Sequence, residues 1–485
     1  MPEHKFNLRV RPDLETRKLS VQVELLTPQF GGGAEARTPD VKQWLRPASV
    51  RGALRFWWRA LFGASFPNIH ALHAAESAIF GSSAGDNANG QPGKLSVVVK
   101  ALADGRATSW AEYQRREDER IKAEKAARRA FISSAQSIAY FPANENKTER
   151  LAAAELVSPS VRAELTVCAL SAVGAQPYQL TDTQWQQVLE ALRAFILFGG
   201  SGSRTRRSAG AICCASPHDA QALGMPVTAD ALTAWISKYR QQKYEHDCFL
   251  LSRCQAVYMT AEQYDKGERA QEALLRMWRE FRQQRKHPES WSGPHNWGRT
   301  RWPEADAIRL IAGQYASWEN GGHPIDHRPV QSNGGKASRA HLGLPIIVKY
   351  KDDATAREKE TRFNEFRRGR WIDHEPQPTE IVQVKLDDTQ KPLLLDRYAS
   401  PILLAVTGVT SPRQQERFQF IGVVLITSSV LNQGSTLILK GQAESKLSPG
   451  AWEKILDSPT DPIGLYQVLA RHNYRRLFPS EGTTK

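Results

Sequence analysis

The sequence predicts an α+β protein with two domains, and three observations support this prediction. Its length of 485 residues suits two or three domains. The first half alternates strand patterns with two amphipathic helices. The second half carries helix and strand patterns in a less regular order. We therefore expect a first domain at residues 1–220 and a second at residues 221–485.

The first domain begins with a strand, a glycine loop and a helix. Apolar residues alternate with polar ones from Leu19 to Leu25, which is typical of a strand. Pro28 ends the alternation, and three glycines follow. Apolar residues then recur at i, i+4, i+7 and i+11 from Val50 to Leu61, which predicts an amphipathic helix. Ser49 is the expected N-cap and Gly63 the expected end.

The remaining elements of the first domain complete a known motif. Strand patterns occupy residues 94–102, 162–170 and 209–215, and a helix pattern occupies residues 183–200. A charged helical insertion is expected at residues 106–135. The order is therefore β-α-β-β-α-β, the ferredoxin-like (RRM-like) arrangement of two helices on one face of a four-stranded antiparallel sheet.

The second domain is expected to be another α+β unit of the same kind. Helix patterns lie at residues 227–240, 261–286 and 463–477. Strand patterns lie at residues 342–350, 379–386, 400–407, 416–427 and 435–440. Residues 286–340 are loop-rich and contain four tryptophans and four histidines, and a loop of this length usually has a function or is disordered. Its tryptophans either stack on unpaired bases or anchor the loop to the core.

The composition narrows the class of protein. Lysine and arginine number 65 against 51 acidic residues, so the formal net charge is +14, which favours a polyanionic partner. No run of 18 apolar residues is present and the N-terminus lacks an apolar leader, so we expect a cytoplasmic protein without membrane contact. The five cysteines form no CxxC pair. We expect no metal site and no cofactor.

The predicted helix after the first glycine loop carries a stripe of arginines. Arg51, Arg55 and Arg59 recur every four residues, and no acid lies between residues 41 and 75 to relieve them. Like charges at this spacing repel by about 0.2–0.5 kcal/mol per pair. Gly52 costs the helix about 1 kcal/mol relative to alanine. We therefore expect an anion against the stripe or a close approach at Gly52; the alternative is a solvated cationic face.

A glycine–arginine loop, FGGSGSRTRRSAG, occupies Phe198–Gly210. Its glycines let backbone N–H groups turn toward an anion, and three arginines follow them. It is not an NTPase phosphate-binding loop, because it lacks Gly-Lys-Ser/Thr and follows a helix rather than a strand. In the ferredoxin-like order, it and the Gly31–Gly33 loop can form two walls of one groove.

These segments resemble the Cmr1 family of the RAMP superfamily, whose members are subunits of type III-B CRISPR effector complexes. The matching motifs run in the family's order from about residue 20 to about residue 405. They are TPQFGGG, RPASVRGALRFWWRALFG, ESAIFGS, FGGSGSRTRRSAG, RTRWPEADAIR, HLGLPI and ASPILL. The sequence departs from the family at Ser208-Ala209, where a glycine and an aromatic residue are expected, and in the 106–135 insertion.

The resemblance implies two ferredoxin-like domains of the RAMP type and assembly with other Cmr subunits around a guide RNA. It implies a non-catalytic protein that binds guide and target RNA near the 3′ end of the guide, because cleavage resembles the task of a different subunit. No catalytic residue carries over. The implied RNA-contacting arginines are Arg46, Arg51, Arg55, Arg59, Arg204, Arg206 and Arg207. The implied glycine loops contain Gly31, Gly32, Gly33, Gly199, Gly200 and Gly202.

Two alternatives stay open. One is a metal-independent endoribonuclease that processes CRISPR RNA, which would need a general base such as histidine near a 2′-hydroxyl. His70 and His73 share one helix face, but no histidine has a second acid or base at a spacing that indicates a catalytic pair. The other alternative is a generic basic RNA-binding protein, which would show similar glycine and arginine loops.

Overall fold

The structure is a computed structural model that describes residues between 17 and 478. Its longer gaps are at 120–153, 287–298, 314–334 and 349–378, and shorter gaps lie elsewhere. By internal contacts the chain divides into two compact units. Unit 1 contains Met1–Cys254, Glu262–Ala273 and Leu404–Val423, and unit 2 contains Gln255–Ala261, Leu274–Leu403 and Val424–Lys485.

Unit 1 is built around an antiparallel four-stranded sheet with the order β3-β6-β1-β9. Along the chain the elements are β1 (Lys18–Leu25), α1 (Pro47–Phe62), β3 (Leu95–Ala101), β6 (Arg162–Ala169), α5 (Asp182–Phe198) and β9 (Ile212–Cys214). The four strands and two helices predicted for this half are thus present in the predicted order. The mixed α+β class is confirmed.

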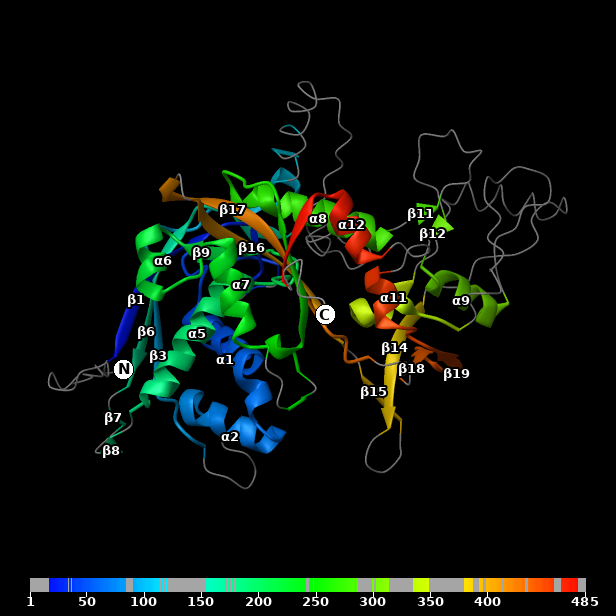
Figure 1. The fold of residues 1–485 in the computed structure, drawn as a ribbon, viewed down its shortest axis with the longest axis horizontal. Helices are drawn as coiled ribbons and strands as arrows, with labels where there is room; N and C mark the ends of the chain where they lie inside the picture. The colour runs from blue at the N-terminus through cyan, green and yellow to red at the C-terminus, as the bar shows by residue number, and fades with distance from the viewer. Residues whose placement is uncertain are drawn as a thin grey trace. The chain divides into compact units, whose positions relative to one another are not determined.

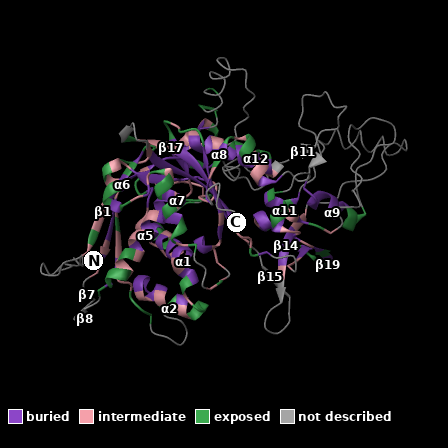
Figure 2. Cartoon of the chain, in the orientation of Figure 1, coloured by how far each residue is buried: buried purple, intermediate pink, exposed green. Residues whose placement is uncertain are grey.

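Helices α1 and α5 pack side by side against this sheet (Figure 1). Their inward residues Leu54 and Leu192 are fully buried, as are Val23 of β1 and Leu165 of β6. Figure 2 shows buried residues along both helices. Burying each such side chain contributes about 1.5–3 kcal/mol. This core holds the N-terminal end of α1 and the C-terminal end of α5 at one end of the helix pair.

Helix α1 begins earlier than the sequence predicts. Its N-cap is Arg46 and Pro47 is its first residue, so Ser49 lies inside the helix and the predicted cap is wrong. Proline suits this position because its fixed φ fits the first turn and its missing N–H would have no partner there. The predicted end is confirmed, because Gly63 is the C-cap.

Smaller elements complete the N-terminal part of unit 1. A three-stranded sheet has the order β2-β5-β4 and places β2 directly before the first glycine loop. The charged insertion predicted at 106–135 begins with β4, and most of it lies outside the described residues. These elements are β2 (Gln29–Phe30), η1 (Gly63–Ser65), α2 (Ile69–Phe80), β4 (Ala107–Ser109), β5 (Glu155–Val157), β7 (Ala172–Val173), β8 (Gln176–Pro177), α6 (Pro217–Leu223) and α7 (Ala229–Ser237).

A second four-stranded sheet has the order β16-β17-β10-β20. It contains β10 (Cys254–Thr260), β16 (Ile402–Ser411), β17 (Gln414–Thr427) and β20 (Tyr474–Phe478). Two helices, α8 (Gly267–Gln283) and α12 (Leu465–Arg471), lie between these strands in the chain. The helix predicted at 463–477 therefore ends too late, because its last residues form β20, where Tyr474 and Leu477 are buried.

Unit 2 contains a smaller sheet with the order β13-β14-β18-β19, to which β15 is added. Its core includes Ile308, Ile381 and Leu437. In the segment predicted to be loop-rich, Trp302 is buried against Phe281, with ring centroids 5.5 Å apart, so this tryptophan anchors the chain. The other three tryptophans lie outside the described residues. The further elements are η3 (Leu251–Arg253), β11 (Arg285–Lys286), β12 (Arg299–Thr300), α9 (Glu304–Ala312), η5 (Ser338–Leu342), β13 (Ile346–Val348), β14 (Thr379–Leu386), β15 (Pro392–Leu395), β18 (Thr436–Leu439), β19 (Gln442–Leu447) and α11 (Trp452–Asp457).

Candidate nucleic-acid interface

The structure brings the two predicted glycine loops together in unit 1. The amide of Ser203 donates a hydrogen bond to the carbonyl oxygen of Phe30 at 2.8 Å. The amide of Gly210 donates to the carbonyl oxygen of Pro28 at 3.0 Å. The glycine–arginine loop therefore lies directly against the chain that leads into Gly31–Gly33.

The glycines allow this close approach of two backbones. A Cβ atom on Gly202 would lie 2.6 Å from the carbonyl oxygen of Phe30, and the φ of Gly202 is +85°. A positive φ or a backbone contact under 3 Å also applies to the other predicted glycines: Gly31, Gly32, Gly33, Gly199 and Gly200. The amides of Ser201 and Ser203 donate to backbone carbonyls, so at these two positions the loop bonds to itself and to β2 rather than presenting its N–H groups.

Three other elements hold the arginine part of the loop in place. The carbonyl oxygen of Ser208 accepts hydrogen bonds from Thr27 Oγ1 at 2.6 Å and from Gln271 Nε2 of α8 at 2.9 Å. The carbonyl oxygen of Arg206 accepts one from the amide of Leu404 at 3.1 Å. Leu404 belongs to the ASPILL motif, which gives this motif a structural role. The backbone that carries the arginines is therefore fixed before any ligand binds.

The arginine stripe on α1 is not free of acidic partners, which corrects the sequence-based expectation. Glu76 of α2 accepts from Arg55 Nε at 2.6 Å and from Arg59 at 2.7 Å. Its side chain is only 4% exposed. The acid-free window ends one residue before Glu76, and the turn between α1 and α2 brings this carboxylate back onto the stripe. Two of the predicted RNA-contacting arginines therefore also tie α1 to α2.

The first two arginines of this segment also have partners within the protein. Arg46 lies 3.7 Å from a carboxylate oxygen of Asp40, the residue just before the acid-free window. Arg51 donates to the carbonyl oxygen of Phe80 at the end of α2. Both side chains are half-buried. Their charges remain near the protein surface, but part of their hydrogen-bonding capacity is used in holding the fold.

The contact between the two predicted cationic segments is made by aromatic rings that the sequence reasoning did not single out. The guanidinium of Arg206 lies 5.7 Å from the ring centroid of Phe56 on α1 and 4.8 Å from that of Phe249. The two rings stack at 5.8 Å with an interplanar angle of 22°. Phe249 lies in an irregular segment before η3, so no periodic pattern marks it.

The exposed face of α1 links the arginine stripe to this aromatic contact. At 3.6 residues per turn, Arg59, Gly52 and Phe56 project within about 60° of one another. Gly52 is exposed, and apart from its neighbours in the chain and the backbone of α1 no described atom lies within 4 Å of a Cβ built on it. The close approach expected at Gly52 is thus not made by the described part of this chain, and the face is open.

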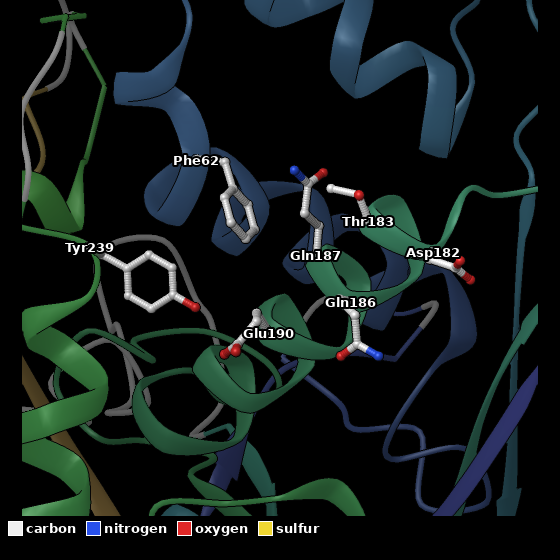
Figure 3. Close-up of a pocket in the computed structure, with 7 residues that line it drawn as sticks. All are labelled: Phe62, Asp182, Thr183, Gln186, Gln187, Glu190 and Tyr239. Atoms are coloured by element: carbon white, nitrogen blue, oxygen red, sulfur yellow. The ribbon is translucent and has the colours of Figure 1, made fainter.

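A pocket of about 460 Å³ lies at the opposite end of the α1–α5 pair (Figure 3). Phe62, the last residue of α1, and Tyr239 lie beside side chains from the first turns of α5. Glu190 accepts from Trp235 Nε1 at 2.6 Å. Burial, together with Glu190, raises the pKa of Tyr239. The lining includes Asp182 and Glu190 and no basic residue, so it does not suit a polyanion.

The described histidines have roles that the fold explains. His341 is buried. Its Nε2 donates to the carbonyl oxygen of Gly450 at 3.1 Å, its Nδ1 lies 2.7 Å from the hydroxyl oxygen of Ser429, and burial lowers its pKa. His70 and His73 are exposed on α2. Within the described ranges, no group of three or more histidine, cysteine or acidic residues is arranged to hold a metal ion. None of the described helices is long and apolar enough to span a membrane.

A known protein family matches the part of the chain that contains the two glycine loops. The model of the RAMP superfamily matches residues 22–213, which contain β1, α1, both glycine loops and the end of the first sheet. The chain is also 38% identical over 91 residues to the CRISPR system Cmr subunit Cmr1-2 of Pyrococcus furiosus. The predicted resemblance to the Cmr1 family is confirmed.

The matched regions are partial. The 91-residue alignment covers 19% of this chain and 46% of the Pyrococcus furiosus relative, so the chain spans about half the length of that protein. The crystal structure of apo Cmr1 from Pyrococcus furiosus is 11% identical over 96% of this chain and 99% of that one, with a TM-score of 0.45. A chain from the structure of the type III-B Cmr-beta complex bound to cognate target RNA is 11% identical, and the match covers 84% of this chain and 94% of that one, with a TM-score of 0.38. Likenesses at these TM-scores add no weight to the assignment.

Proposed function

We propose that this chain is a non-catalytic RNA-binding subunit of a type III-B CRISPR (Cmr) effector complex that acts in antiviral defence in the cytoplasm. It binds guide and target RNA near the 3′ end of the guide and assembles with other Cmr subunits. The Cmr subunit that shares 38% identity with the chain over 91 residues supports this proposal. The net charge of +14 favours a polyanionic ligand.

One observation carries the proposal: hydrogen bonds to several other segments of the protein fix the backbone of the glycine–arginine loop. Its anchors are β2, Thr27, Gln271 and Leu404. A ligand that binds such a loop does not have to order it, so less binding free energy is lost. Arginine suits a phosphate backbone because its planar guanidinium donates two hydrogen bonds at once.

The predicted contact residues divide into two groups in this proposal. Arg204, Arg206 and Arg207 are the main phosphate ligands, since they lie on the fixed loop. The arginines of α1 form the second group, and their contribution is reduced because Glu76 and Asp40 lie close to them. Gly202 lets the two walls of the groove approach each other closely, and the other glycines let the two loops turn: Gly31, Gly32, Gly33, Gly199 and Gly200.

The proposal includes two ferredoxin-like domains, at residues 1–220 and 221–485. Numbered along the chain, the strands of each four-stranded sheet have the same spatial order, second-third-first-fourth. A βαββαβ unit with two helices between its strands produces this order. The shared order supports a duplication of one architecture, with the smaller sheet of unit 2 as an addition to the second domain.

The most direct test is to tag the full chain in its native host and to sequence the RNA that purifies with it. We expect repeat-derived guide RNA together with partner subunits. Recovery of unrelated RNA with no partner subunit would favour a generic RNA-binding protein instead. Incubation of the purified chain with labelled single-stranded RNA, with and without EDTA, tests for cleavage, and shortened RNA in both samples would favour the endoribonuclease.

The contribution of the loop can be measured by salt dependence. Each phosphate contact to single-stranded RNA adds about 0.7 to the slope of log K against log salt concentration. We expect Arg204→Ala combined with Arg206→Ala to lower the magnitude of this slope by about 1.4. Binding should weaken similarly for all RNA sequences, because phosphate contacts carry no base information. An unchanged slope would remove the loop from the interface.

A further inference from the structure

Three planar groups meet where the glycine–arginine loop contacts α1. The guanidinium of Arg206 lies 4.8 Å from the ring of Phe249 and 5.7 Å from the ring of Phe56. The rings themselves are nearly parallel and 5.8 Å apart. The three groups come from three separate stretches of the chain. We call them the aromatic–arginine cluster: Phe56, Arg206 and Phe249.

The cluster differs from the aromatic core beneath it in its exposure. Trp57 and Phe198 are 3% and 1% exposed, and their rings pack at 5.9 Å inside the protein. Phe56, Arg206 and Phe249 are each only half-buried, so part of every group faces outward. Proteins that bind single-stranded nucleic acids stack the bases on exposed aromatic rings that lie beside a positively charged surface.

The surface next to Phe56 is shaped by small residues. Helical side chains point toward the N-terminus, so the ring of Phe56 lies toward the turn that carries Gly52. Gly52 has no side chain, and open space surrounds the position where its Cβ would be. Ser49, one turn earlier, is small and exposed. The surface of α1 beside the cluster is therefore open to a ligand.

We propose that the aromatic–arginine cluster stacks one unpaired nucleobase of single-stranded RNA, an inference that rests on the proposed RNA-binding function. The rings and the guanidinium supply flat faces that every base can use, so the contact adds affinity without selecting a sequence. Arg206 then serves both ends of a nucleotide, because its charge attracts the phosphate and its plane completes the stacking surface. A protein partner is disfavoured as the occupant, because Arg204 and Arg207 flank the site with positive charge.

The test compares Phe249→Leu with wild type in binding a single-stranded RNA of mixed sequence. Loss of one stacked base weakens binding by about 5- to 150-fold. The salt slope should not change, because no charge is removed. Phe62→Leu is the matched control: Phe62 is also half-buried and contacts an aromatic ring, Tyr239 at 5.8 Å, but it lies at the other end of α1. It should leave RNA binding unchanged.

A second measurement starts from the wild-type chain, so its main result does not depend on whether a variant folds. An abasic site is moved one position at a time along the shortest single-stranded RNA that the wild-type full chain binds, so that the RNA can bind in one register only. One position should lose affinity by the same factor as Phe249→Leu, and Phe249→Leu should be insensitive to an abasic site there. Equal affinity for RNAs with the abasic site at every position would overturn the stacking proposal. So would a Phe249→Leu variant that binds RNA as tightly as wild type but no longer assembles with protein subunits.

These outcomes separate the two proposals. If the wild-type chain binds no single-stranded RNA and co-purifies with none, the proposed function fails, and the stacking site fails with it. In a second outcome, the wild-type chain binds RNA and the Arg204→Ala, Arg206→Ala double variant has a reduced salt slope. If Phe249→Leu and every abasic site then leave the affinity unchanged, only the stacking site fails. The phosphate-binding loop would then act alone.

Discussion

Gly52→Ala should make the protein more stable and its RNA binding weaker. Gly52 lies within α1, where glycine costs about 1 kcal/mol relative to alanine because its backbone loses more freedom on folding. Apart from its neighbours in the chain and the backbone of α1, the new methyl group meets no described atom within 4 Å, so no clash offsets this gain. We therefore expect the free energy of unfolding to rise by about 1 kcal/mol. For a cooperative unit of 150–250 residues this corresponds to roughly 2–4 °C in the thermal midpoint.

The effect on RNA binding should have the opposite sign. If RNA packs against the exposed face between Phe56 and the arginine stripe, the methyl group occupies space that the ligand needs. Crowding a packed contact by one carbon costs about 1–3 kcal/mol, or about 5- to 150-fold in affinity. Titration of labelled single-stranded RNA with each variant, followed by fluorescence anisotropy, measures this loss. The same preparations are heated while the circular dichroism signal is recorded.

Ala74→Gly is the matched control for this prediction. Ala74 is exposed on α2, away from the open face of α1, so its change to glycine should lower stability by about 1 kcal/mol and leave RNA binding unchanged. A fall in stability for Gly52→Ala would mean that the space beside Gly52 is filled. Unchanged RNA affinity for Gly52→Ala would mean that RNA does not approach this face, and the role given to α1 would be refuted.

Two further variants test charges that the fold brings together. Glu76→Gln keeps the size of the side chain but removes the buried carboxylate between Arg55 and Arg59. We expect the free energy of unfolding to fall by about 1–3 kcal/mol and RNA binding to become tighter. An RNA affinity at or below that of wild type would place the α1 arginines outside the interface. In unit 2, a hydrogen bond from His472, with Arg471 nearby, lowers the pKa of Glu280 to about 2 from 4.5. A lowered carboxyl pKa stabilises the fold above about pH 4.5, and the contribution is lost as the pH falls toward 2. Glu280→Gln should flatten the fall in unfolding midpoint over this range, and a curve as steep as that of wild type would contradict the assignment.

Much of the fold could be predicted because its signals are local. The alternation from Leu19 to Leu25 and the apolar stripe of α1 specify a strand and a helix through nearest neighbours. The start of α1 was missed because Ser49 is a good N-cap in general, whereas Pro47 two residues earlier begins the helix. The strand at Tyr474–Phe478 was missed because its periodicity resembles the end of α12, and its pairing with β10 decides the outcome.

The sequence by itself determined the four strands and two helices of the first sheet, their order, and the composition of the two glycine loops. Only the tertiary structure decided which arginines have acidic neighbours, since Asp40 and Glu76 stand at the borders of an acid-free window and fold back onto it. It also brought Phe249 to Arg206 and Leu404 to the loop that carries it. Ion pairs, ring contacts and hydrogen bonds act over a few ångströms through space. Separation along the chain carries no information about such distances until the core has packed.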